Sequence, residues 1–377
     1  MNIKPFLFAV FTAVAAVPSW SASPGDVGFS LNKGQLPIID SQGRELILQG
    51  LGSGSGKHTE MRRARETAET VEFQAKVLGY NTHRYLIFWD HIMPNKGVIN
   101  TAYLDDIESR LDWFADNKMH VILDMHQDNW SEVCDGNGAP AWATVGAAEP
   151  APGAPWWILA ASPCVIDSVN LFYENHEGWM DEYVNSWAAV AERFKDHPAV
   201  FGYDLMNEPN KATAIIDQMV YEQVNDTDKT LVNTAVKTTV WVNGTPENAL
   251  ESVIKSKISD LASANGVPVP DSYINKITKI IIARNQGDWG SLTAVEEFEG
   301  GDLTNFYQKL INRIRLIDQD KFIFVEPMSL SVNNGFKTWL GDLHDPGTNG
   351  RRLGYIPHMY PRALHEGGAY SDHDYSQ

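Results

Sequence analysis

The chain alternates short apolar runs rich in β-branched and aromatic residues with longer segments whose apolar residues recur at helical spacing. Six of the apolar runs are expected to be strands, near 46–50, 82–88, 120–125, 199–206, 322–325 and 353–357. Helices are expected between them, at 60–78, 101–117, 180–194 and 303–317. Alternating strands and helices are typical of a parallel sheet, so the sequence predicts an α/β fold.

Polar residues gather where these strands end, which favours a (β/α)8 TIM barrel over a doubly wound sheet. No Gly-x-Gly-x-x-Gly follows any strand, which weakens a dinucleotide-binding alternative. Eight strands close a barrel, and each strand–helix unit takes roughly 25 to 35 residues. Residues 361–377 are polar and too few for two units, so we expect a barrel truncated after its sixth strand. The chain is then a truncated product or fragment, or it borrows the missing part.

Two long segments interrupt the alternation. Residues 129–175 are expected to form an irregular loop rich in Trp, Pro, Gly and Ala, and loops of that length are usually functional. Residues 211–301 are expected to be a mostly helical insertion after the fourth strand, with apolar stripes at 250–261 and 274–281. Such stripes are more often the core of a small subdomain. Because the insertion leaves from the end of a strand, we expect it to cap the site.

Residues 1–23 read as a secretory signal peptide, with Lys4, an apolar core and small residues before the expected cleavage point. The mature barrel domain would then span 24–377, secreted or periplasmic. The apolar core is shorter than the ~20 residues of a membrane anchor, and no other span is expected. A formal charge of -18 argues against nucleic acid or anionic membrane as a partner.

Cys134 and Cys164 are the two cysteines of the chain. In an oxidising compartment they are expected to pair, which would contribute ~3 kcal/mol by closing a loop of about 30 residues. Two free thiols are the alternative. Their spacing does not fit a zinc site of the Cys-x-x-Cys type, and no metal is expected.

The fourth strand ends in Asn207-Glu208-Pro209. Pro209 has no N–H and biases Glu208 away from the helical region, so the strand breaks there and leaves the Glu side chain at the rim. Barrel enzymes keep their chemistry at this end of the strands. The simpler interpretation is a strand that ends in polar turn residues, and the tripeptide alone leaves both open.

A carboxyl group beside an amide at a barrel rim suggests acid/base catalysis on a sugar, in which most retaining hydrolases use two carboxylates about 5 to 5.5 Å apart. Glu208 would protonate the leaving oxygen, and Asn207 would bond the 2-hydroxyl. Other strand ends would surround the pair with Arg84, His126, His358 and Tyr360. Taken singly, the arginine is as readily a structural ion pair and each histidine a hydrogen-bonded rim residue.

These motifs resemble glycoside hydrolase family 5, the retaining cellulase-like family. The motifs that carry the resemblance are Arg84, Asp124-Met-His-Gln-Asp128, Asn207-Glu208-Pro209 and His358-Met-Tyr360. Within the family, three stretches look like the endoglycoceramidases: Gly136-Asn-Gly-Ala-Pro-Ala-Trp-Ala-Thr144, Tyr203-Asp-Leu-Met-Asn-Glu-Pro209 and Ile317-Asp-Gln-Asp320.

The resemblance implies that Glu208 is the general acid/base and that Asn207 positions the nucleophile and the 2-hydroxyl. The resemblance also implies that Lys57, Asp124 and His126 line the sugar subsite, that Arg84 braces the catalytic carboxylates, and that Tyr360 lies beside the nucleophile. The family's nucleophile is a Glu at the end of the seventh strand, which this sequence does not reach. The motif at 296–300 precedes the fifth strand and is a poor substitute. Glu326 ends that strand and is a candidate pocket residue with no nucleophilic role in the family pattern.

The expected function is therefore hydrolysis of a β-glycosidic bond, with a glycolipid cut between glycan and ceramide as the first hypothesis. An endo-β-glucanase acting on polysaccharide is the alternative within enzymes. An inactive, sugar-binding remnant is the alternative outside them. The two-carboxylate mechanism needs no cofactor.

Overall fold

The structure is a computed structural model, and its description covers most of the predicted barrel. The described residues are 38, 45–53, 65–148, 160, 162–211, 214, 254–260, 271, 274–275, 278, 294–328, 338–347 and 352–358. The expected signal peptide, Lys57, Tyr360 and most of the insertion lie outside these residues.

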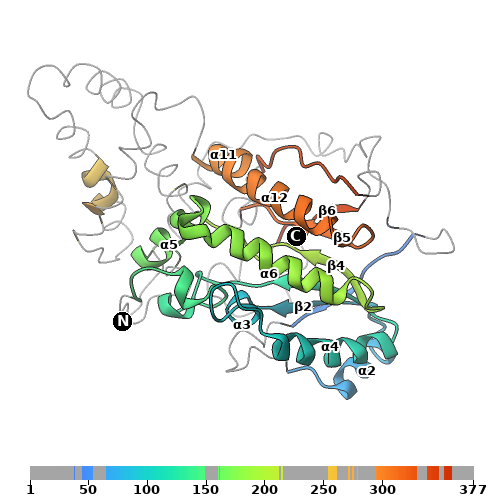
Figure 1. Ribbon diagram of the computed structural model, residues 1–377. Coiled ribbons are helices and arrows are strands. Elements are labelled where there is room, and N and C mark those ends of the chain that lie inside the picture. The colour runs from blue at the N-terminus through green and yellow to red at the C-terminus, as the bar shows by residue number, and fades with distance from the viewer. Residues whose placement is uncertain are drawn as a thin grey trace, which may run out of the picture.

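Six parallel strands form one sheet in the described part of the chain (Figure 1). They are β1 (Gly50–Gly52), β2 (Thr82–Ile87), β3 (His120–Met125), β4 (Val200–Asp204), β5 (Phe322–Val325) and β6 (Leu353–Tyr355). Each strand pairs with its neighbours in the sequence, in the order β1-β2-β3-β4-β5-β6. A doubly wound sheet reverses its strand order at a switch point. The uninterrupted order is that of a (β/α)8 barrel, as predicted, with six strands present.

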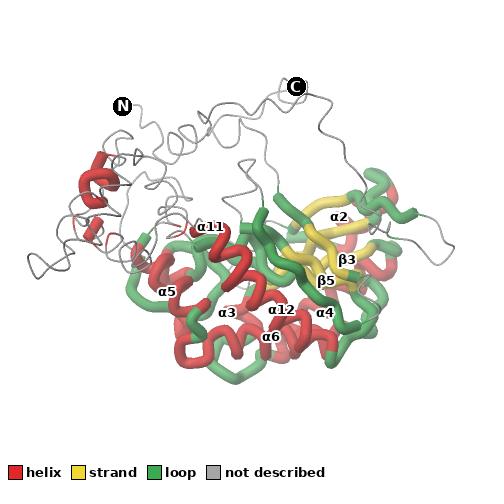
Figure 2. Tube along the Cα trace, turned by 90° about the horizontal axis from the view of Figure 1, so that it is seen from above, coloured by secondary structure: helices red, strands yellow, loops and turns green. Residues whose placement is uncertain are grey.

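Helices pack on one side of these strands, as Figure 2 shows for α4, α6 and α12. The helices are α2 (Ala68–Lys76), α3 (Trp89–Ile92), α4 (Thr101–Asp116), α5 (Pro163–Tyr173), α6 (Trp179–Phe194), α11 (Ala294–Glu297) and α12 (Thr304–Arg315). The apolar faces expected for α4 and α6 are confirmed: Leu104, Ile107, Leu111 and Phe114, and Tyr183, Trp187, Val190 and Phe194, are all buried. No helix in the described ranges has the length and apolarity that crossing a bilayer requires.

Aromatic side chains of two helices fix the ends of the strands that carry the motifs. Tyr183 and Trp187 of α6 both donate hydrogen bonds to the carbonyl of Leu205, at 2.8 and 2.9 Å. Tyr307 of α12 donates to the carbonyl of Glu326 at 2.9 Å. Buried hydrogen bonds of this kind leave the backbone few alternatives. The rim residues after β4 and β5 are therefore held from the helix side.

Helix α2 begins later than predicted. Residues 65–67 are not helical, although the sequence pattern placed them inside a helix from 60 to 78. Thr67 accepts a hydrogen bond from the amide of Thr70, and the Thr70 side chain accepts one from the amide of Thr67. This reciprocal capping box satisfies two amides at the helix start, and it places the N-terminus at residue 68.

The prediction of an irregular loop over 129–175 is wrong in part. It contains α5 and two short 3-10 helices, η2 (Glu132–Cys134) and η3 (Ala141–Ala143). Ser162 caps α5 by accepting from the amide of Val165, and Pro163 occupies the first turn, where its missing N–H has no cost. Trp130 is buried in this loop and donates to the carbonyl of Ala143. The tryptophan therefore packs the loop.

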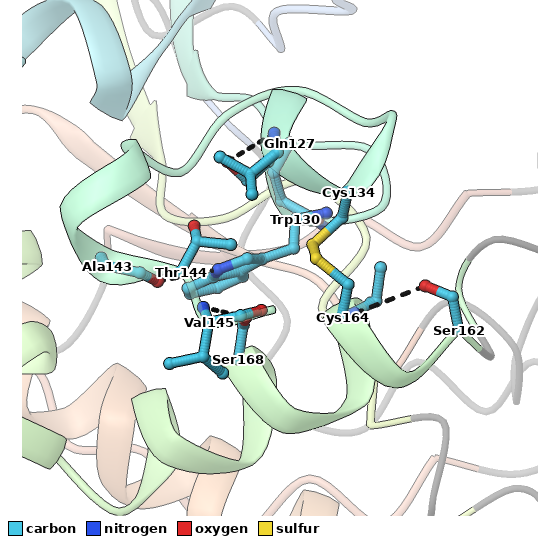
Figure 3. The surroundings of a disulfide bond; sticks show 12 residues. Gln127, Trp130, Cys134, Ala143, Thr144, Val145, Ser162, Cys164 and Ser168 are labelled. Atoms are coloured by element: carbon cyan, nitrogen blue, oxygen red, sulfur yellow. Dashed lines mark hydrogen bonds between the residues drawn. A yellow bond between two sulfur atoms is a disulfide. The ribbon is translucent and has the colours of Figure 1, made fainter. Parts of the chain in front are cut away.

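A disulfide bridge joins Cys134 of η2 to Cys164 of α5, with a Cα–Cα distance of 5.6 Å (Figure 3). Both cysteines are buried. We expect the double substitution Cys134→Ser/Cys164→Ser to lower the free energy of unfolding by about 3 kcal/mol, because an uncrosslinked unfolded chain has more conformational entropy. Urea denaturation measures this. Adding a thiol reductant should destabilise the native protein and leave the double variant unchanged; equal stability of the two oxidised proteins would contradict the prediction.

The insertion re-enters the barrel through an irregular helix. Residues 254–260 are helical, and Ile254 and Ile258 of the expected stripe are buried. The π-helix η7 (Phe298–Leu303) leads into α12. Within it, the buried carboxylate of Glu299 accepts from the amides of Met328 and Trp339, so it fastens the segment after β5. The motif at 296–300 therefore has a structural role in the described residues.

Candidate active site

Charged side chains meet on the inner face of the sheet, one from the middle of β2 and three from the C-terminal ends of β3, β4 and β5. Asp124 of β3 and Asp204 of β4 are register partners, and Glu326 lies two residues beyond Phe324, which pairs with Asp204. Arg84 extends from β2 toward all three carboxylates. The three acids are almost fully buried. Parallel pairing thus brings side chains from four neighbouring strands into one cluster.

Arg84 is the centre of this cluster. Its guanidinium contacts Asp124 at 2.9 Å, Asp204 at 2.7 Å and Glu326 at 2.8 Å, and it donates to Oδ1 of Asn207 at 3.0 Å. Burial opposes the charge of Arg84, but the three carboxylates outweigh it and raise the pKa of Arg84 above its usual value. The side chain is therefore a permanent cation that fixes the amide of Asn207.

Asn207 and Glu208 follow β4 and face the cluster from its rim. The Asn207 side chain donates to the carbonyl of Gln127 at 2.9 Å, and Gln127 donates to the carbonyls of Asn207 and Glu208. Glu208 has a φ of +43°, which non-glycine residues rarely adopt. Its amide donates to Oε2 of Glu326 at 2.9 Å. The backbone that carries the candidate acid/base is thus held from two strands.

His358 follows β6 and lies between two carboxylates. Its Nδ1 is 2.7 Å from Oε1 of Glu208, and its Nε2 is 3.1 Å from Oε1 of Glu326. Burial disfavours the charged ring, but the hydrogen bonds to Glu208 and Glu326 prevail and raise the pKa of His358 to about 10. The ring is an imidazolium at neutral pH and donates to both acids.

His126 lies after β3 in a second pair of carboxylates. Its Nδ1 is 2.7 Å from Asp124, and its Nε2 is 3.4 Å from Asp128. Burial again opposes the charge, and the two acids raise the pKa of His126 to about 9. Asp128 also accepts from Asn137 in the following loop. Because Asp124 contacts both Arg84 and His126, the predicted sugar-subsite residues join the same network as Glu208.

The family model for cellulase, glycosyl hydrolase family 5, matches residues 39–250. That range holds β1 to β4 and includes Arg84, His126, Asn207 and Glu208. The chain belongs to glycosyl hydrolase family 5.

Relatives of this family 5 chain include endoglycoceramidases. Endoglycoceramidase I of Rhodococcus hoagii is 34% identical over 176 residues, covering 46% of this chain and 35% of that protein. Endoglycoceramidase of Cyanea nozakii is 26% identical over 237 residues, covering 55% of this chain and 47% of that protein. The chain thus spans less than half the length of these relatives.

Solved structures agree with this placement in family 5. Endo-glycoceramidase II from Rhodococcus sp., in its ganglioside GM3 complex, matches with a TM-score of 0.63 and 27% identity over 90% of this chain and 62% of that one. The same enzyme in another structure matches with a TM-score of 0.62 and 28% identity, over 88% and 60%. The family barrel is therefore present with six of its strands described.

The structure brings together most of the predicted site of this family 5 chain. Arg84, Asp124, His126, Asn207, Glu208 and His358 form one connected network. Among the described residues, no group of three or more His, Cys, Asp or Glu side chains is arranged to hold a metal ion.

The sequence indicated no role for Asp204 or Gln127, and it made Glu326 a candidate pocket residue with no nucleophilic role. Burial raises the pKa of Asp204 well above its usual value, and the charges of Glu326 and Asp124 add to this against the opposing effect of Arg84. The sequence signal that points to Asp204 and Glu326 is the alternation of side chains between the two faces of a strand. Each lies two residues after an inward-facing position of its strand, Gly202 and Phe324, and so shares that face.

The two charged histidines predict a loss of stability in alkali. Each has a folded pKa above the ordinary value of 6.5, so each stabilising contribution is complete below pH 6.5 and is lost as the pH rises through about 9 for His126 and about 10 for His358. We expect the free energy of unfolding to fall by about 2 kcal/mol or more between pH 6.5 and 10.

Urea denaturation at a series of pH values measures this loss. His126→Asn should flatten the slope between pH 6.5 and 9, whereas His176→Asn, at a half-exposed histidine outside the site, should keep it. A native protein whose stability is constant or rising over that range would contradict the assignment of charge to the two rings.

Proposed function

We propose that this chain is the catalytic part of a retaining β-glycoside hydrolase that cuts the bond between glycan and ceramide in glycosphingolipids. The observation that carries the proposal is the position of Glu208, beside Asn207 at the end of β4 and hydrogen-bonded to a cationic His358. The family and the endoglycoceramidase relatives support the substrate class.

In this proposal Glu208 begins as the carboxylic acid and gives its proton to the glycosidic oxygen, while a second carboxylate bonds to the anomeric carbon and displaces that oxygen. The carboxylate that remains accepts a hydrogen bond from the His358 imidazolium. In the second half of the reaction water attacks the anomeric carbon and displaces the second carboxylate, and Glu208 takes a proton from that water, which restores the acid. Asn207, oriented by Arg84 and Gln127, is placed to bond the 2-hydroxyl of the sugar.

We assign the second carboxylate of the retaining reaction to none of the described acids. Glu326 is 1% exposed, and its oxygens accept from Arg84, His358 and the amide of Glu208. A carboxylate that is buried and held by these donors is not assigned as the nucleophile. Asp124 and Asp204 are likewise buried against Arg84.

The test is hydrolysis by the whole 377-residue chain. The protein is incubated with lactosylceramide and, separately, with a soluble cellulose derivative, and released sugars are measured. Oligosaccharide from the glycolipid alone is the expected result. Hydrolysis of the cellulose derivative alone would favour the endo-β-glucanase. If neither is cut but calorimetry detects binding of lactose, the chain is a sugar-binding remnant and the catalytic proposal is wrong.

We also infer export from the cell. The disulfide supports this, because such bridges persist in oxidising compartments. N-terminal sequencing of the protein recovered outside the cytoplasm should begin near residues 21–23 or just after them, and an intact Met1 there would contradict the signal-peptide assignment.

A further inference from the structure

Glu326 is linked to the candidate acid/base Glu208 directly through the backbone and indirectly through His358. It follows β5, its side chain is 1% exposed, and both of its carboxylate oxygens are engaged. One oxygen bonds the backbone of Glu208, and the other bonds the ring that bonds the Glu208 side chain. A buried carboxylate is costly unless its charge is compensated, and here Arg84 at 2.8 Å compensates it.

The backbone contact fixes a strained conformation. Glu208 has a φ of +43° and precedes a proline, which restricts its backbone further. Residues held in such sparsely populated regions cost on the order of 1–3 kcal/mol and persist only when the surroundings determine them. Oε2 of Glu326 accepts from the Glu208 amide at 2.9 Å, and Gln127 donates to the Glu208 carbonyl at 3.0 Å. Glu326 thus holds the amide side of Glu208 and Gln127 the carbonyl side, and together they fix the backbone from which the acid/base side chain extends.

The side-chain contact runs through His358. Its Nε2 faces Oε1 of Glu326 at 3.1 Å, which leaves Nδ1 as the nitrogen that faces Glu208 at 2.7 Å. The groups that act on the ring include Glu208 from the end of β4, Glu326 from the end of β5 and Arg84 from β2. Of these, Arg84 repels a charged ring and the two carboxylates favour it. Removing the charge of Glu326 would take away one of the two carboxylates that favour the charged ring and leave the repulsion from Arg84 in place.

We propose that Glu326 is a positioning residue that sets both the aim and the charged hydrogen-bond partner of Glu208, acting through the Glu208 amide and through His358. The proposal rests on the proposed role of Glu208 as acid/base. It requires no contact between Glu326 and substrate. A positioning role explains why Glu326 lies within the cluster while both of its carboxylate oxygens accept from protein donors.

The first test needs no turnover. The ring of His358 is titrated by NMR in protein labelled at histidine, with the signal assigned by its absence in His358→Asn. In Glu326→Gln the midpoint should fall by roughly one pH unit or more from its native value of about 10, because a nearby carboxylate typically shifts a pKa by about 1–3. An unchanged midpoint would overturn the proposal whether or not the chain hydrolyses glycolipid.

The second test uses turnover. Glu326→Gln should lower kcat on lactosylceramide by about tenfold to 100-fold with little change in KM, since general acid/base catalysis as a whole contributes typically about 10²–10⁴. The loss should grow as the pH rises toward the lowered His358 midpoint, because the variant's ring then gives up its proton before the native ring does. Combining Glu326→Gln with His358→Asn should cost less than the product of the two single losses, because both act on Glu208.

Asp345→Asn is the matched control. Asp345 is also a buried carboxylate paired with a buried arginine, Arg315, but it contacts none of the site residues in the described structure. It should lower stability without moving the His358 midpoint or kcat. If Glu326→Gln behaved as Asp345→Asn does, Glu326 would be structural only. Should Glu326→Gln fail to fold, Glu326→Asp keeps the charge beside Arg84 but shortens the reach; it should fold and still lose kcat, and native kcat in that variant would contradict the proposal.

Discussion

Glu208→Gln should lower kcat/KM for lactosylceramide by about 10²–10⁴-fold while the protein stays folded, because an amide of the same size has no proton of comparable acidity for the leaving oxygen. The substitution keeps an oxygen that accepts from Nδ1 of His358. Released oligosaccharide measures the rate, and the thermal unfolding midpoint measures the fold. Glu192→Gln, at an exposed glutamate that pairs only with Lys195 in the described structure, is the control and should be as active as the native chain.

A second substrate distinguishes the loss of a proton donor from a general loss of structure in Glu208→Gln. A dinitrophenyl β-lactoside has a leaving group that departs without protonation, so its kcat/KM should fall far less in Glu208→Gln than that of the glycolipid. Equal losses on both substrates would show that Glu208 does not protonate the leaving oxygen. Native activity on the glycolipid would remove Glu208 from the mechanism altogether.

The strands were predictable because they carry a strong local signal. Residues 121–123 and 322–325 are continuous apolar runs, and the structure places them in β3 (His120–Met125) and β5 (Phe322–Val325), the bounds that the sequence predicted. Helix α5 was missed because Trp, Pro and Gly dominate the composition around it, although Ser162 and Pro163 are a start signal for a helix. Capping residues set the start of both α5 and α2. They are only a few residues each, so the average composition of a segment does not reveal them.

Site residues could be predicted where the local sequence marks them, but contacts between residues far apart in the sequence could not. Glu208 stands at a strand end that the sequence marks with a proline. Its link to Glu326 spans 118 residues, and its link to His358 spans 150, so both depend on how the strands align in the sheet. The positive φ of Glu208 has no sequence signal at all, because a glutamate before proline is expected in extended backbone. It follows from the contacts that surround it.

Arg84→Met should be the most destabilising single substitution in the site, with a loss of about 3–5 kcal/mol in the free energy of unfolding, because it leaves buried carboxylates without their cation. Asp124, Asp204 and Glu326 all contact Arg84 within 2.9 Å. Urea denaturation at pH 7 measures the loss. Arg193→Met removes a surface arginine that pairs with Asp105 and Glu108, and it should cost less than about 1 kcal/mol.

Two further measurements identify charge as the cause of that loss. Arg84→Lys keeps a cation but not the planar fork that reaches several acids, so its stability should lie between the native protein and Arg84→Met. In Arg84→Met the uncompensated acids bind protons more tightly when folded than when unfolded, so the deficit should narrow as the pH falls from 7 to 5. If the deficit were the same at both pH values, the guanidinium would stabilise the barrel by packing alone, and the carboxylates around it would not depend on its charge.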